Sequence, residues 1–206
     1  MARGNKIASV TAGVVLIAGI GMAAAPASAT LNKRESATVI SFKKDFVSAL
    51  RSQGIKISAQ APATWNSARA EIRFPVTGVT ADSISHSGGM TFTKGDSPLT
   101  VTNPAVVADP DSPNFTVFVE SALGRIPLLV IKNTRSSTIC KVDGAHHSWI
   151  KKTTTRVHGF VHLTADASVV ATLQGLLTPD LTADLGLGAG RVTLVDDLNS
   201  KTKLKC

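Results

Sequence analysis

Hydrophobic and polar residues alternate along much of the chain, and this two-residue period is typical of half-buried β-strands. In the clearest case, Ile72, Phe74 and Val76 alternate with Arg73 and Pro75. Similar alternation is present at 90–92, 99–101, 115–119 and 156–163, and a continuous apolar run at 126–131 predicts a more buried strand. Turn-forming residues separate these segments at 77–83, 93–98, 102–104, 108–114 and 141–147.

Two other segments carry apolar residues at helical spacing. The first helix is predicted over residues 36–53, ending before Gly54, and its apolar positions are Val39, Phe42, Phe46 and Leu50. The second is predicted over residues 164–177, with Thr164 as its N-cap and Asp166 as an acid in its first turn.

The segment after the second helix, 188–198, returns to a strand pattern. Many short, closely spaced strands rich in Val and Thr indicate an antiparallel sandwich or barrel. We expect a mostly β fold, an antiparallel β-sandwich with one N-terminal helix and one helix in the C-terminal region.

The first 29 residues have the pattern of a secretory signal peptide: a basic start, an apolar run and the small residues Ala27-Ser28-Ala29 before the cleavage point. Cleavage there leaves residues 30–206, a length that suits a single domain with its own core. A retained N-terminal anchor is the alternative, because the apolar run is almost long enough to span a bilayer. We expect a protein outside the cell, free or held loosely at its surface.

The composition of the chain limits the kinds of binding partner that we expect. Without Arg3 and Lys6, the mature chain has 20 Lys and Arg residues against 14 Asp and Glu, a net charge of +6. Such an excess suits an anionic wall polymer, a lipid surface or an acidic small ligand. The lysines are dispersed and there is no arginine-rich helix, so a nucleic acid is not expected as a partner.

Two cysteines, Cys140 and Cys206, are present. In an oxidising compartment they are expected to form a disulfide with each other, and two free thiols are the alternative. No cysteine is left for a metal cluster or a thiol nucleophile. The chain contains no tyrosine.

The sequence has no pattern that predicts an enzyme or a metal centre. There is no Gly-x-Ser-x-Gly motif, and no phosphate-cradling or dinucleotide-binding motif. His86 is expected at the rim of a turn made by Ser87, Gly88 and Gly89, with a ligand-binding role as the alternative. His146 and His147 are expected in a solvated turn.

One strand presents a candidate binding face. His158 and His162 are four residues apart, about 13 Å in an extended strand, which is too far to share one metal ion. With Arg156 and Phe160 on the same face, they could line a flat aromatic ligand. The alternative is the polar outer face of an antiparallel sheet.

Three motifs, in order, resemble the HtaA-type domain, a secreted or surface β-sandwich module of bacterial haemin-uptake systems. Residues 41–45 are similar to its first element, and 74–76 with Gly78 are similar to its Phe-Pro-Val strand. Residues 92–99, followed by Asn103 and Pro104, are similar to its glycine-rich hairpin. The resemblance covers most of residues 38–195.

The resemblance implies haem binding, which in that family rests on a tyrosine that ligates iron and an assisting histidine. Asp45 stands where the tyrosine would fall and Gly95 where the histidine would fall. The reasonable haem ligands are then the histidines His86, His158 and His162.

Two functions therefore remain open. The first is a non-enzymatic binding module for haem, another porphyrin or another small anionic ligand, with haem as a ligand rather than a cofactor. Its predicted binding residues are His86, Arg156, His158, Phe160 and His162. The second is a structural or adhesive domain that contacts the cell envelope and has no small ligand.

Overall fold

The computed structural model describes residues 30–145, 148–200, 204 and 206. The predicted signal peptide, His146 and His147 lie outside these residues. The helices are α1 (Lys44–Ser52) and α2 (Ala167–Leu176). The strands are β1 (Thr30–Leu31), β2 (Ala37–Phe42), β3 (Ile55–Gln60), β4 (Thr64–Asn66), β5 (Glu71–Val79), β6 (Ser83–His86), β7 (Gly89–Lys94), β8 (Ser97–Ala108), β9 (Phe115–Ser121), β10 (Gly124–Ala145), β11 (Ser148–Leu163) and β12 (Gly186–Ser200).

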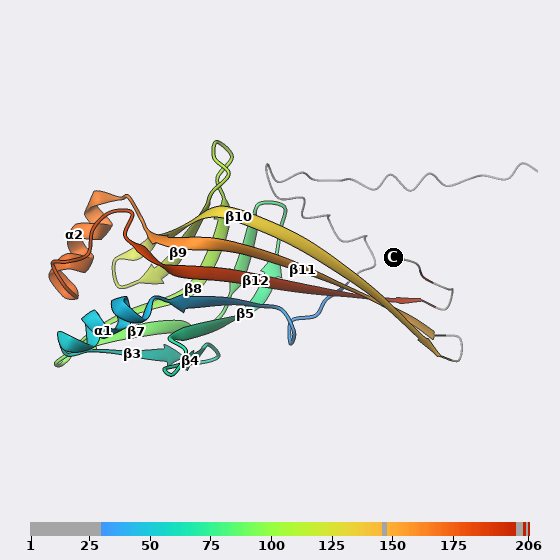
Figure 1. Cartoon of the computed structure of the whole chain (residues 1–206), viewed down its shortest axis with the longest axis horizontal. Coiled ribbons are helices and arrows are strands. Elements are labelled where there is room, and N and C mark those ends of the chain that lie inside the picture. The colour runs from blue at the N-terminus through green and yellow to red at the C-terminus, as the bar shows by residue number, and fades with distance from the viewer. Residues whose placement is uncertain (1–29, 146–147, 201–203, 205) are drawn as a thin grey trace, which may run out of the picture.

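Eight of these strands close into an antiparallel barrel, so the predicted sandwich is wrong (Figure 1). Their order around the barrel is β8-β6-β5-β2-β12-β11-β10-β9, and the ring closes where β8 pairs with β9. Ala105 lies opposite Phe118 and Ala108 opposite Phe115 in this closing pair. Sandwiches and barrels share the same inward and outward alternation, so the hydrophobic period alone does not separate them.

The predicted strands are confirmed, and their apolar positions fill the barrel. Ile72, Phe74 and Val76 of β5 are at most 4% exposed and belong to the main hydrophobic cluster. β10 contributes Leu128, Leu129 and Ile131 to the same cluster, in agreement with the apolar run seen in the sequence.

The first helix is shorter than predicted. Its expected N-terminal part is β2, which pairs with β12 on one edge and with β5 on the other. Only Lys44–Ser52 is helical, with Val47 and Leu50 buried. The burial of Ile40 and Phe42, two residues apart, is equally compatible with a strand. Because this segment pairs on both edges with other strands, it forms a strand although its apolar spacing also fits a helix.

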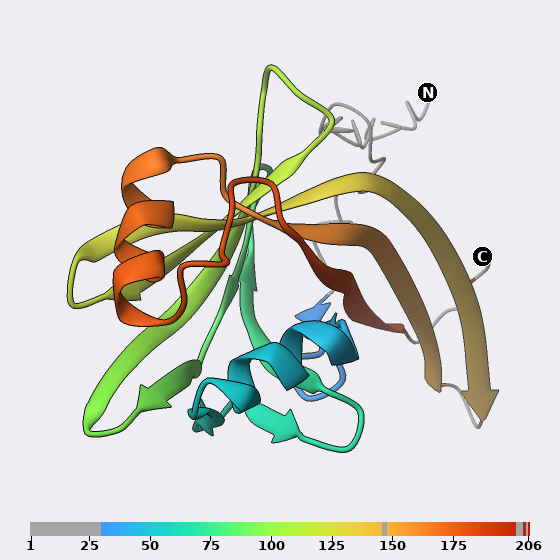
Figure 2. The ribbon, with the colours of Figure 1, turned by 60° about the vertical axis from the view of Figure 1, so that its left-hand side comes forward.

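The second helix is confirmed, with a different N-cap. The carboxylate of Asp166 accepts hydrogen bonds from the backbone N–H groups of Ser168 and Val169, at 2.9 and 3.2 Å. Thr164 instead accepts a bond from the backbone N–H of Asp166. Both helices lie at the same end of the barrel (Figures 1 and 2).

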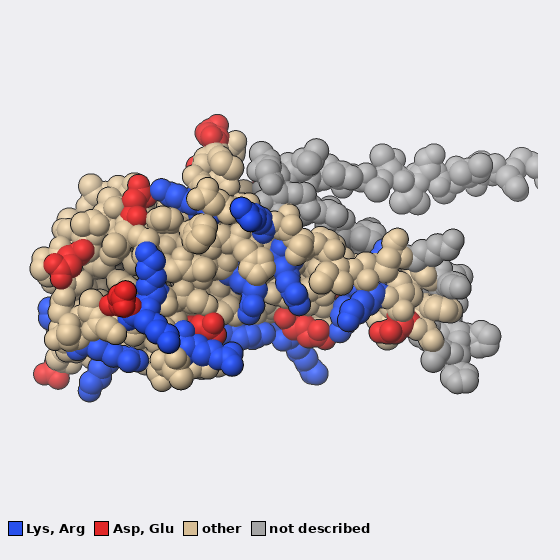
Figure 3. Space-filling view, viewed as in Figure 1, with Lys and Arg blue, Asp and Glu red and all other residues tan. Residues whose placement is uncertain are grey.

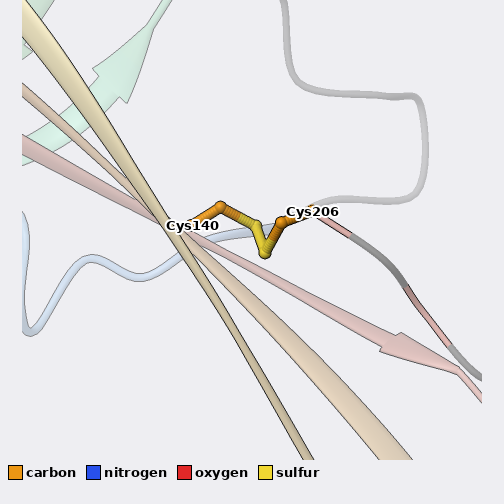
Figure 4. Close-up of a disulfide and its surroundings, with 2 residues drawn as sticks. All are labelled: Cys140 and Cys206. Atoms are coloured by element: carbon orange, nitrogen blue, oxygen red, sulfur yellow. A yellow bond between two sulfur atoms is a disulfide. The ribbon is translucent and has the colours of Figure 1, made fainter.

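At the opposite end, β10, β11 and β12 continue beyond the barrel as a curved three-stranded arm (Figures 1 and 2). We define the arm as residues 138–145, 148–155 and 194–200. The predicted turn at 141–147 is partly wrong, because β10 remains paired with β11 as far as Ala145. The arm also carries the Cys140–Cys206 disulfide, with 5.7 Å between the two Cα atoms, which confirms the predicted pairing (Figure 4).

The junction between β6 and β7 depends on a glycine. Gly88 has a φ of +85°, and a Cβ placed there would lie 2.8 Å from the carbonyl oxygen of Gln60 and closer still to the backbone nitrogen of Ala63. We expect Gly88→Ala to lower the free energy of unfolding by about 2 kcal/mol, because it adds both an unfavourable φ and a backbone clash.

Urea denaturation followed by circular dichroism measures this change. Gly78→Ala is the matched control, since Gly78 has an ordinary φ and no atom within 4 Å of the added Cβ. Equal effects of the two substitutions would contradict the role assigned to Gly88.

Candidate functional site

His86 lies inside the barrel rather than at the rim of a turn, and it is 5% exposed. Its Nδ1 is 2.9 Å from the carbonyl oxygen of Pro104 and its Nε2 is 2.5 Å from Oγ1 of Thr38. A carbonyl oxygen only accepts, so Nδ1 carries the proton and Nε2 accepts from the threonine hydroxyl. The ring of Phe74 packs near the imidazole in an edge-on arrangement.

Both ring nitrogens of His86 are thus occupied by the protein itself. Burial lowers its pKa to about 4, and the hydrogen bond to Pro104 opposes this shift only in part. The residue is a neutral imidazole at neutral pH that links β2, β6 and β8. The structure does not bring it together with the other predicted binding residues.

The other four predicted residues lie on β11. Arg156, His158 and Phe160 are exposed on the outer surface of the barrel, and Phe160 is 58% exposed. The ring of Phe160 is therefore accessible to a ligand or partner. His162 is half-buried further along the strand.

A groove of about 400 Å³ opens on this outer surface, within the range of small-molecule sites. We call it the outer groove. Its lining residues come from β2, β5, β11, β12 and the part of β10 at the barrel: Val39, Ser41, Glu71, Asn133, Arg135, His158, Gly159, Phe160, Ala189, Gly190 and Arg191. The small residues Ala189, Gly190 and Ser41 leave room beside Phe160.

The sheet register places a histidine between two arginines in this groove. His158 pairs with Arg135 on β10 and with Arg191 on β12. Neighbouring strands are about 4.8 Å apart, so the two arginines start from positions about 10 Å apart on either side of the imidazole. Phe160, two residues along, lies between Lys132 and Ala189.

The polar groups of the outer groove are available to a ligand. Within the described part of the chain, the side chains of His158, Arg135 and Arg191 have no hydrogen-bond or ion-pair partner. Glu71, in contrast, accepts a hydrogen bond from Ser41 at 3.0 Å. A free imidazole, two free guanidinium groups and an exposed ring can together hold a flat ligand that carries carboxylates.

Arg156 and His162 border the outer groove without lining it. Arg156 pairs with Ser137 and Thr193 on the side toward the arm. His162 donates from Nδ1 to the carbonyl oxygen of Asp184 at 3.0 Å. The Asp184 carboxylate also bonds Lys132 at 2.8 Å, and this contact lowers the pKa of Asp184.

Asp45 and Gly95 stand where the resemblance to HtaA-type domains places the haem ligands, and these two positions do not form a site comparable to the outer groove. Asp45 is exposed in the first turn of α1, and Gly95 is exposed in the turn between β7 and β8 with a φ of +58°. The nearby interior holds a cavity of about 40 Å³ lined by apolar side chains, among them Phe42, Phe46 and Met90. That volume is far too small for a porphyrin.

Sequence reasoning found His158 and Phe160 but missed Arg135 and Arg191. These arginines enter the site through cross-strand pairing, and the registers of β10 and β12 against β11 are not visible in the sequence. The one available signal was alternation within β12, where Arg191 precedes the buried Val192.

No group of three or more His, Cys, Asp and Glu side chains that could hold a metal ion occurs among the described residues. In the same part of the chain, neither helix is long and apolar enough to cross a membrane.

Comparisons with known proteins identify the type of fold. No family model and no curated protein matches this sequence. The structure is similar to the crystal structure of the haem-binding protein HtaB from Corynebacterium glutamicum, with a TM-score of 0.50 and 15% identity over 84% of this chain and 96% of that one. It is also similar to the C-terminal domain of HtaA from the same organism, with a TM-score of 0.50 and 11% identity over 81% of this chain and 99% of that domain. The fold is therefore of the HtaA type.

Proposed function

We propose that this chain, which has an HtaA-type fold, is a non-enzymatic binding module whose ligand is haem or a closely related porphyrin. The outer groove would hold the ligand through the ring of Phe160 and through Arg135 and Arg191 at its carboxylates, and the imidazole of His158 would supply a nitrogen ligand to its iron. The observation that carries the proposal is the placement of an unpartnered imidazole between two unpartnered arginines beside an exposed aromatic ring.

Charge supports an anionic ligand. Lys and Arg side chains spread along the lower side of the molecule in Figure 3, with Asp and Glu scattered among them. Because guanidinium groups bind carboxylates in a bidentate manner, arginines are well suited to the propionates of a porphyrin. The similarity to a haem-binding protein agrees with the same ligand class.

We further propose that residues 30–206 act as one domain outside the cell, free or loosely held at its surface. The signal-peptide pattern in residues 1–29 and the Cys140–Cys206 disulfide both support export, because disulfides persist in oxidising compartments.

Titration of the 30–206 protein with haemin tests the proposed ligand. We expect a saturable shift of the haem absorption band at one haemin per chain. His158→Ala should change the band and weaken binding at least tenfold, since it removes the iron ligand. Arg135→Gln and Arg191→Gln should each weaken binding several-fold and leave the position of the band unchanged.

Lys141→Gln is the control for a general charge effect, because Lys141 is exposed on the arm away from the outer groove. Serum albumin is the control for the optical measurement. A flat titration of the wild-type protein would reject haem as the ligand and favour the structural or adhesive function. Unchanged binding by the His158 and arginine variants would place haem elsewhere on the chain.

A further inference from the structure

A second groove, of about 490 Å³, lies between β3 and β4, and we call it the β3–β4 groove. Its lining residues are Arg51, Gly54, Ile55, Lys56, Ile57, Trp65 and Ser67. None of them lines the outer groove. Its volume falls within the range of ligand sites.

Two strands that each have an open edge border this groove. Among the described residues, β3 pairs only with β7 and β4 pairs only with β5. A short turn at 61–63 joins β3 to β4, and residues of both strands line the groove. Open edges carry backbone N–H and C=O groups that require partners.

The side chains that line the groove favour a ligand of a particular chemistry. Trp65 and Ile57 are half-buried, and the ring of Trp65 packs 6.1 Å from that of Phe42. Arg51 and Lys56 are exposed and have no ion-pair partner among the described residues. No Asp or Glu lines the groove.

We propose that the β3–β4 groove binds an extended, acidic peptide segment of a partner protein. The segment adds a strand between β3 and β4, as in β-augmentation, and its backbone bonds one or both open edges. An apolar side chain rests on Trp65 and Ile57, while flanking carboxylates meet Arg51 and Lys56. A peptide fits better than an acidic glycan, because only a peptide offers the repeating N–H and C=O groups that strand edges pair with.

The fluorescence of Trp65 provides a direct test. The chain has two tryptophans, and Trp149→Phe leaves Trp65 as the only one. The probes are acetylated and amidated hexapeptides with Val, Leu or Phe at alternating positions and Glu, Gln or Lys between them. We expect saturable changes in fluorescence with Glu peptides, binding at least tenfold weaker with Lys peptides, and weaker binding at higher salt.

Two further comparisons separate a strand from other occupants. The Lys56→Glu variant should reverse the preference from Glu to Lys peptides, and its exposed position makes loss of folding easy to exclude by circular dichroism. Glu peptides N-methylated at alternate residues should bind at least tenfold more weakly, since they cannot pair with an edge.

Equal binding of Glu and Lys peptides would overturn the proposal, as would tight binding of the N-methylated series. A fluorescence change with a galacturonate hexamer and none with any peptide would assign the groove to an acidic glycan instead. Haemin binding uses other residues, so it should be the same with and without peptide.

Discussion

Replacing both cysteines of the disulfide, Cys140→Ser with Cys206→Ser, should lower the free energy of unfolding by about 4 kcal/mol. The two residues are 66 positions apart, and their bond closes a loop that contains the whole of β11 together with α2 and β12. In the chain-entropy account, cross-linking a loop of that length removes much of the freedom of the unfolded chain. Urea denaturation followed by circular dichroism measures the loss.

Reduction separates the cross-link from the packing of the cysteine side chains. Wild-type protein in excess dithiothreitol should unfold at the same urea concentration as the double variant, and the double variant should not respond to reductant. If the double variant is destabilised and the reduced wild-type protein is not, the loss of stability comes from packing around Cys140. A loss below about 1 kcal/mol would contradict the entropic account.

The second large effect is a dependence of stability on pH that comes from His86. Its pKa is about 4 in the folded protein, whereas an unperturbed histidine, such as that of the unfolded chain, has a pKa of 6.5. Below pH 6.5 the unfolded chain takes up a proton that the folded chain refuses, so stability falls as the pH decreases toward 4. The full difference corresponds to about 3 kcal/mol, and it is present above pH 6.5 and lost below pH 4.

His86→Gln isolates this contribution, because glutamine retains a donor for the carbonyl of Pro104 and an acceptor for Thr38 without titrating. We expect the stability difference between wild type and variant to shrink by about 3 kcal/mol between pH 7 and pH 4, measured by urea denaturation at each pH. His158→Gln, at an exposed position, should retain the wild-type pH dependence. A constant difference between wild type and His86→Gln across this range would contradict the assignment.

Local sequence pattern predicted most strands and the general position of both helices, because alternation and helical spacing report directly on which side chains are buried. The pattern failed where the pairing between strands determines the secondary structure. Residues 37–42 satisfy both periods, and only their place between β5 and β12 makes them a strand. Turn-forming residues were also misleading: Asn103 lies within β8 at a φ of +49°, where the register between β8 and β9 shifts, and is not the end of a strand.

Only part of the candidate site could be predicted from the sequence, for a related reason. His158 and Phe160 are near neighbours in the sequence, whereas Arg135 and Arg191 approach them only when three strands align. His86 illustrates the converse case. Its serine and glycine neighbours resemble an exposed turn, yet Thr38 and Pro104, both distant in sequence, surround it inside the barrel.

The central position of β12 has a consequence for how the chain acquires its fold. This strand, the last in sequence, pairs with β11 and with both β1 and β2, the first strands in the described chain. The barrel cannot close before the C-terminal segment is available, and pairings between such distant segments make folding slow. A newly made chain therefore cannot close its barrel until β12 (Gly186–Ser200) has been synthesised, and until then β2 and β11 each lack one of their partner strands.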